Sequence, residues 1–107
     1  MNTGWDVEDI IKLLNDIGID NLSETKHFPK HIEENIPEIS SVINDYILSK
    51  KPVGILKQDD SKFKLYYELD DKYDLIIVIS VKSESPITIS LITCFKQPSK
   101  RRVRKDD

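Results

Sequence analysis

Both histidines of the chain lie in the short segment from Thr25 to His31, where the residue types allow acid–base or metal chemistry. His27 and His31 are four positions apart, so on a helix they would share one face. Imidazole titrates near neutral pH, which suits it to general acid–base catalysis. His27, His31 and Glu34 could also approach one metal ion, but a metal site normally takes ligands from other segments too. The chain has no second cluster of histidine or cysteine. We therefore expect no metal, and catalytic and purely structural roles of the two histidines both remain open.

Helical patterns surround this segment in the N-terminal half of the chain. A first helix is predicted from Asp6 to Gly18, because apolar residues recur there at spacings of three and four. A second helix is predicted over Lys26 to Asn35, with Pro29 in its first turn. A third begins at Pro37. Its predicted buried stripe is Ile39, Val42, Ile43, Tyr46 and Ile47. The segment Ile19 to Leu22, between the first two helices, has the pattern of a short extended edge segment.

Four consecutive β-strands are predicted in the second half of the chain. They are Val53 to Lys57, Phe63 to Leu69, Tyr73 to Lys82 and Ile87 to Phe95. Their short connections require antiparallel pairing. The second strand alternates, which buries one face and places Tyr66 with the lysines on the solvent face. The third strand has an apolar run without alternation, so it should be central and at least partly covered on both faces. The predicted fold class is α+β, with two to three N-terminal helices packed on one face of a four-stranded antiparallel sheet.

The length of 107 residues allows one domain with one modest core. We expect a single α+β domain over residues 1–97 and a flexible basic C-terminal tail over residues 98–107. No apolar run is long enough to span a membrane, and the start does not resemble a signal peptide, which favours a cytoplasmic protein with no membrane partner. The single cysteine, Cys94, lies in an apolar strand and is predicted to be a buried structural thiol.

The formal net charge of −3 is distributed unevenly along the chain. From Lys96 onward six basic residues accompany two acidic ones, so this end carries +4, the remainder carries −7, and all three arginines lie in the tail. An acidic body binds nucleic acid poorly, so any phosphate contact should be local to the tail and the surface beside it. A solvated chain end without a partner is the alternative.

The order of these motifs resembles the barnase/EndoU/colicin/RelE nuclease superfold, and especially its small bacterial, archaeal and phage members. The similar features are T-K-H-F at Thr25 to Phe28, H-I-E-E-N-I-P-E-I at His31 to Ile39, the apolar helix that follows, and four strands ending in S-L-I-T-C-F at Ser90 to Phe95. The resemblance covers residues 23–96 and implies a RelE-like fold. It also implies a toxin-like endoribonuclease that cleaves RNA without a metal or cofactor, by attack of the 2′-hydroxyl on the adjacent phosphorus.

The resemblance further implies which residues would act. The catalytic residues would be His27 as base or acid, Lys26 as a stabiliser of the phosphorane charge, and Thr93 as a hydrogen-bond donor. Substrate binding would involve His31, Lys96, Tyr66, Arg101 and Arg102, with Lys96 beside the phosphorane and Tyr66 stacked on a base. The partners of such a toxin would be RNA and an antitoxin protein.

One position departs from the pattern of this superfold. Asn35 falls where many relatives have arginine, which removes a fixed positive charge from the supposed phosphate site. The departure favours an alternative function on the same scaffold, a non-catalytic binding module of a mobile element or virus that engages a protein or a nucleic acid. The sequence leaves the choice between enzyme and binding module open.

Overall fold

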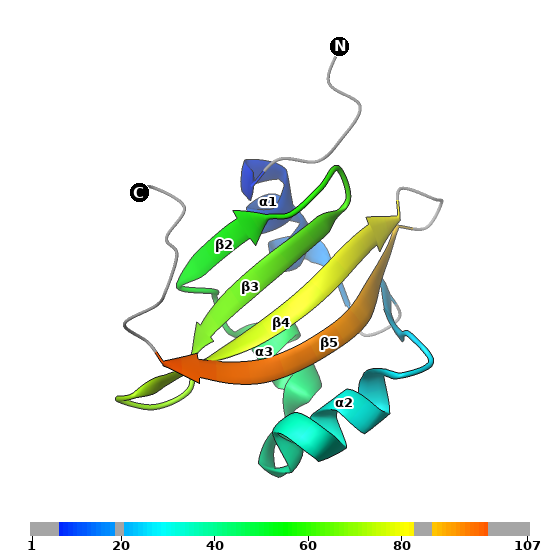
Figure 1. Cartoon of the computed structure of the whole chain (residues 1–107). Helices are drawn as coiled ribbons and strands as arrows, with labels where there is room; N and C mark the ends of the chain where they lie inside the picture. Colours follow the sequence, from blue (N-terminus) through cyan, green and yellow to red (C-terminus); the bar gives the residue numbers. More distant parts are fainter. Residues whose placement is uncertain (1–6, 19–20, 83–86, 99–107) are drawn as a thin grey trace.

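The computed structural model describes residues 7–18, 21–82 and 87–98 (Figure 1). The elements in chain order are α1 (Val7–Asp16), β1 (Leu22–Glu24), α2 (Phe28–Asn35), the 3₁₀-helix η2 (Pro37–Ile39), α3 (Ile43–Ser49), β2 (Gly54–Lys57), β3 (Lys62–Glu68), β4 (Tyr73–Lys82) and β5 (Thr88–Pro98). The predicted helix start at Asp6, the first two residues of the predicted edge segment at Ile19 to Leu22, and residues 99–107 of the predicted tail, with Arg101 and Arg102, lie outside the described residues.

The five strands form one mixed sheet in the order β1-β5-β4-β3-β2. Strands β2 to β5 pair in antiparallel fashion, as predicted. The prediction of a four-stranded antiparallel sheet is wrong in one respect, because β1 adds a fifth strand that pairs in parallel with β5, Leu22 opposite Ile89. Parallel neighbours need a long crossover connection, and here the crossover contains every element between β1 and β5, from α2 to β4. The extended edge segment predicted at Ile19 to Leu22 shares only Leu22 with β1, because a strand of three residues with so distant a partner is weakly marked in the local sequence pattern.

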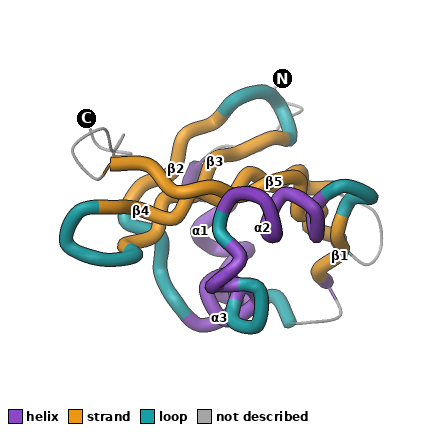
Figure 2. Tube along the Cα trace, turned by 60° about the horizontal axis from the view of Figure 1, so that its bottom comes forward, coloured by secondary structure: helices purple, strands orange, loops and turns teal. Residues whose placement is uncertain are grey.

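All three helices lie on one side of the sheet (Figure 2). Their apolar stripes and the facing side chains of the strands form a single core. Its fully buried members include Ile10, Phe28 and Ile36 from the helical layer and Phe63, Leu65, Leu75, Ile77 and Ile79 from the sheet. Burial of this apolar area is the main stabilising contribution to such a fold. Among the described residues, no helix is long and apolar enough to cross a membrane.

The third predicted helix is divided into two pieces. The 3₁₀-helix η2 begins at Pro37, a turn follows, and α3 begins only at Ile43. Ser40 and Ser41 lie in the turn, and serine favours turns because its hydroxyl competes for backbone groups. The break changes the helical phase, so Val42 is 38% exposed and does not belong to the buried stripe in which it was predicted.

The strand β4 is central and covered on both faces, as predicted. Alternate residues such as Ile77 and Ile79 belong to the core beneath the helices. On the helix-free face of the sheet, Ile76 is fully buried and Val78 is 8% exposed. This face is therefore only partly accessible, although no described helix covers it.

The two turns on either side of β3 have the same construction. In the β2–β3 turn the Asp59 Oδ1 accepts hydrogen bonds from the backbone N–H groups of Ser61 and Lys62, at 2.9 and 2.8 Å. In the β3–β4 turn the Asp70 Oδ1 accepts from Lys72 and Tyr73, both at 2.8 Å. These bonds favour the ionised carboxylates and lower the pKa of both aspartates. Each aspartate thus fixes a tight turn and with it the register of the sheet.

Candidate functional site

The predicted site requires the start of α2 to lie beside β5, and the structure brings these two elements together. The Thr25 Oγ1 donates to the carbonyl oxygens of Leu91 and Ile92, at 3.1 and 3.4 Å. At the other end of the helix, the Asn35 Nδ2 donates to the carbonyl oxygen of Cys94, at 3.1 Å. The helix therefore lies along the edge of β5 that continues beyond the short strand β1 (Figure 1).

The two histidines share one face of α2, as their spacing predicts. Their rings are stacked with centroids 6.5 Å apart and an interplanar angle of 25°. Asn35 is four residues beyond His31, so its bond to β5 indicates that this face borders the strand. His27 is exposed, whereas His31 is half-buried and its Nδ1 has no hydrogen-bond partner among the described residues.

The first turn of α2 is poorly suited to hold a phosphate. A helix start binds anions through free backbone N–H groups. The N–H of Phe28 instead donates to the carbonyl oxygen of Thr25, at 3.1 Å, and Pro29 has no N–H. Lys26 and Lys30 are exposed on either side of this turn. The lysines thus supply positive charge near His27, but not all the backbone N–H groups that would bind a phosphate are free.

Thr93 and Lys96 lie on opposite faces of the sheet. Thr93 pairs with Val78 and shares the helix-free face with it, while Lys96 pairs with Leu75, whose side chain belongs to the core face. The Lys96 Nζ lies 5.0 Å from the centroid of the Tyr73 ring, a cation–π contact at the end of the strand. Lys96 is also four residues beyond Ile92, which corresponds to about 13 Å along a strand. The structure therefore does not bring Lys96 together with Thr93 or with the start of α2.

A β-bulge in β5 lies next to the start of α2. The register passes from Val78 opposite Thr93 to Ile79 opposite Leu91, so Ile92 is the extra residue. Bulges often re-aim side chains near functional sites. Here the carbonyl oxygen of Ile92 accepts a hydrogen bond from the Thr25 hydroxyl, so the bulge helps to hold the start of α2 against β5.

Tyr66 was predicted to be exposed for base stacking, and this prediction is wrong. Its side chain is 2% exposed. Tyr66 lies between Gly54 of β2 and Ile76 of β4 on the helix-free face, and its hydroxyl is hydrogen-bonded to Gln97. Burial raises the pKa of Tyr66, and the nearby Asp74 carboxylate adds to that rise. An internal position in the sheet, where neighbours flank the ring on both sides, explains the burial.

Asn35 and Cys94 have structural roles in the described fold. The Asn35 side chain satisfies a strand carbonyl group at a point where β1 no longer pairs with β5. Cys94 is fully buried, and burial raises the pKa of its thiol to about 11. The prediction of a buried, structural cysteine is confirmed. In residues 7–18, 21–82 and 87–98, no three or more His, Cys, Asp or Glu side chains group closely enough to hold a metal ion.

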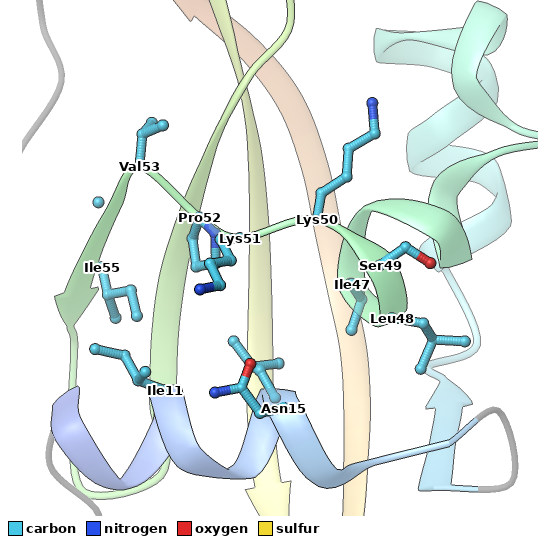
Figure 3. A pocket seen from close by; sticks show the side chains of 12 residues that line it. Ile11, Asn15, Ile47, Leu48, Ser49, Lys50, Lys51, Pro52, Val53 and Ile55 are labelled. Carbon is cyan, nitrogen blue, oxygen red and sulfur yellow. The ribbon is translucent and has the colours of Figure 1, made fainter.

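Sequence reasoning missed a pocket of about 370 Å³ between α1, α3 and the start of β2 (Figure 3). We call it the α1–α3–β2 pocket. Its lining residues are Ile11, Leu14, Asn15, Ile47, Leu48, Ser49, Lys50, Lys51, Pro52, Val53, Gly54 and Ile55. Apolar residues predominate, and the polar members include Asn15 and two adjacent lysines.

Fold and site together define a small α+β domain with a five-stranded mixed sheet, a helical layer on one side and a pocket within that layer. The chain belongs to the MJ0788 family, whose model matches residues 8–79. It is similar to the uncharacterized protein MJ0788 of Methanocaldococcus jannaschii, with 38% identity over 64 residues that cover 57% of this chain and 80% of that protein. No solved structure matches the chain. The matched range contains both histidines and all the residues that line the pocket.

Proposed function

We propose that the chain is a non-catalytic binding module that holds its ligand in the α1–α3–β2 pocket. The observation that supports this most directly is the pocket lining, which contains no histidine, cysteine, aspartate or glutamate. General acid–base catalysis near neutral pH most often uses histidine or a carboxylate, and the serine and lysines of the lining have no such base among the lining residues to activate them. The pocket is thus equipped to bind a molecule rather than to transform it.

The positions of the expected catalytic residues support the same proposal. Thr93 and Lys96 project from opposite faces of the sheet, and Tyr66 is buried. The side chain of Asn35, at the position where the nuclease pattern has arginine, donates a hydrogen bond to the Cys94 carbonyl oxygen of β5. A phosphodiester bound beside His27 would therefore meet few of the groups that should stabilise its transition state.

Growth and cleavage assays test this proposal directly. We expect bacteria that express the full chain to grow normally, and purified protein to leave a mixture of structured and unstructured RNA intact. The His27→Ala variant should be indistinguishable from wild type in both assays. Growth arrest or RNA cleavage that the His27→Ala substitution abolishes would contradict the proposal.

A second candidate is the RelE-like, toxin-like endoribonuclease, and one observation favours it. The start of α2 lies against β5, at the bulge one residue before Thr93. In this proposal His27 exchanges the 2′-hydroxyl or 5′-oxygen proton, Lys26 stabilises the phosphorane, and Thr93 donates a hydrogen bond at the sheet edge. The protein would act in the cytoplasm on RNA and be neutralised by an antitoxin.

Substitutions of His27 and Lys30, at the start of α2, provide a matched pair for testing the second candidate. If it holds, His27→Ala should lower RNA cleavage by about a hundredfold or more, as loss of a general acid or base does. Cleavage should persist in the presence of EDTA. The Lys30→Ala variant, on the same helix, is the control and should retain activity. Equal activity of the His27→Ala and wild-type proteins would end this candidate.

A further inference from the structure

We propose that the α1–α3–β2 pocket takes a small amphipathic anion, a carboxylate on a medium-length apolar chain, with the carboxylate at Lys51. The inference deepens the proposed function and rests on it, since it names the ligand class of the same pocket. It depends on three features of the lining: its apolar walls, its size and the direction of one lysine.

The walls of the pocket suit an apolar chain. Ile11 and Leu14 come from α1, Ile47 comes from α3 and Ile55 comes from β2, so aliphatic side chains converge from three elements (Figure 3). Burial of an apolar chain against them removes apolar surface from water, which favours binding in proportion to the area buried. The Asn15 side chain lies among these residues and can donate or accept a hydrogen bond.

The size of the pocket suits a small molecule. Its volume of about 370 Å³ lies near the lower end of the range of about 300 to 1,000 Å³ that is usual for ligand sites. It is more than twice the roughly 150 Å³ of an engineered apolar cavity that binds benzene. A chain of several methylene groups with a compact head fits this volume, whereas a folded partner does not.

The charge at the mouth of the pocket comes from one of two adjacent lysines, both of which are exposed. The side chain of Lys51 points toward Asn15 and the isoleucines below it, whereas Lys50 points away from the pocket (Figure 3). The Lys50 Nζ lies 4.6 Å from the centroid of the Tyr46 ring, which holds it in that direction. No carboxylate is among the described lining residues. An ammonium group above an apolar floor is complementary to a carboxylate at the end of an apolar chain.

Titration calorimetry with octanoate tests the inference, and Lys50 supplies the matched control. We expect saturable binding of octanoate by the full wild-type chain, and clearly weaker binding of octanol, octylamine and acetate. The Lys51→Ala substitution should weaken octanoate binding by about ten- to a hundredfold, because it removes a charge-assisted hydrogen bond. The Lys50→Ala substitution should change it less than about twofold. Backbone amide shifts on titration should centre on Ile11, Asn15 and Ile55.

Three results would overturn the inference: no octanoate binding by the wild-type chain, equal binding of octanol and octanoate, or equal effects of the Lys50→Ala and Lys51→Ala substitutions. A folded far-ultraviolet spectrum for each variant ensures that lost binding is not lost structure. The RNA assay separates this inference from the proposed function. His27-dependent cleavage would overturn the non-catalytic function even if octanoate binds, whereas absent cleavage without octanoate binding overturns only the ligand class.

Discussion

Tyr66 and Tyr67 are neighbours on β3 with buried rings on opposite faces, and their hydroxyls differ in one respect. The Tyr66 hydroxyl is hydrogen-bonded to Gln97. The Tyr67 hydroxyl is buried without a partner among the described residues, and burial raises its pKa. A buried polar group without a partner costs about 1 to 3 kcal/mol, whereas a satisfied one contributes about 1 kcal/mol.

The substitution Tyr67→Phe should therefore stabilise the protein. The Tyr67 ring packs edge-on against the Tyr46 ring, with centroids 5.7 Å apart, and a phenylalanine at position 67 preserves that contact. We expect the free energy of unfolding in urea to rise by about 1 kcal/mol. The matched variant Tyr66→Phe should lower it by a similar amount, since it removes a hydrogen bond. Changes of the same sign in both variants would show that the hydrogen-bonding difference is not what matters.

At the scale of the element, the docking of α2 on β5 depends on polar bonds at both of its ends. The Asn35→Ala substitution removes the bond to the Cys94 carbonyl group and leaves that group without its partner. We expect a loss of about 1 kcal/mol in the free energy of unfolding, measured by urea denaturation. The control Glu34→Ala, at an exposed position on the same helix, should change stability by less than about 0.5 kcal/mol. Equal losses in the two variants would contradict a specific role for the asparagine.

The two aspartate turns make the sheet sensitive to acid. The folded-state pKa values of Asp59 and Asp70 are lowered by the backbone N–H groups that they accept from. A lowered folded-state pKa adds stability above the unfolded-state value, about 3.9, and this contribution is lost as the pH falls through the folded-state pKa. We expect the variant with asparagine at both positions to be less stable than wild type at about pH 7. The difference between them should shrink below about pH 4, as followed by thermal melts. A difference that stays constant with pH would show that the two carboxylates do not contribute through their charge.

The elements that the sequence predicted well are those whose signal is local. The strands β3 and β4 depend on alternation and on a continuous apolar run, and both were predicted to within one residue at each end. The stacked pair on α2 follows from a spacing of four. Val42 was misplaced because a turn interrupts the periodicity, and β1 was misplaced because its partner is distant in sequence.

The site could be predicted less completely than the strands, because much of it depends on contacts between elements. The opposite orientation of Thr93 and Lys96 follows from strand alternation, since the two positions are three apart and regularly paired. The burial of Tyr66 needed the neighbouring strands. The α1–α3–β2 pocket needed three elements, and no local pattern in the sequence indicated it.

At the scale of the whole molecule, the basic groups are separated along the sheet. The cations at the start of α2 lie near Leu91, while the last described residue of β5, Pro98, pairs with Tyr73. Seven residues of strand separate these places, which corresponds to about 23 Å. Among the described residues, the lysine at the start of α2 and the end of β5 therefore lie far apart, which agrees with the proposal of a pocket-binding module.

Phe28 is fully buried at the start of α2, and its loss should affect more than local packing. The Phe28→Ala variant should lose about 3 to 5 kcal/mol of stability. We also expect it to form oligomers that increase with protein concentration, as measured by light scattering, because the helix would leave the edge of β5. The Pro29→Ala variant, at an exposed position, should remain dispersed. A destabilised Phe28→Ala protein with unchanged light scattering would contradict this expectation.

The reason for that expectation is the length of the strand that α2 shields. The strand β5 has 11 residues, while β1 shields only three of them and α2 lies along much of the rest. Long unprotected strand edges are templates for further strands. While α2 covers this edge of β5, it protects the protein against aggregation. Mild heating or a nearby destabilising mutation should therefore first produce insoluble protein, before most molecules have unfolded.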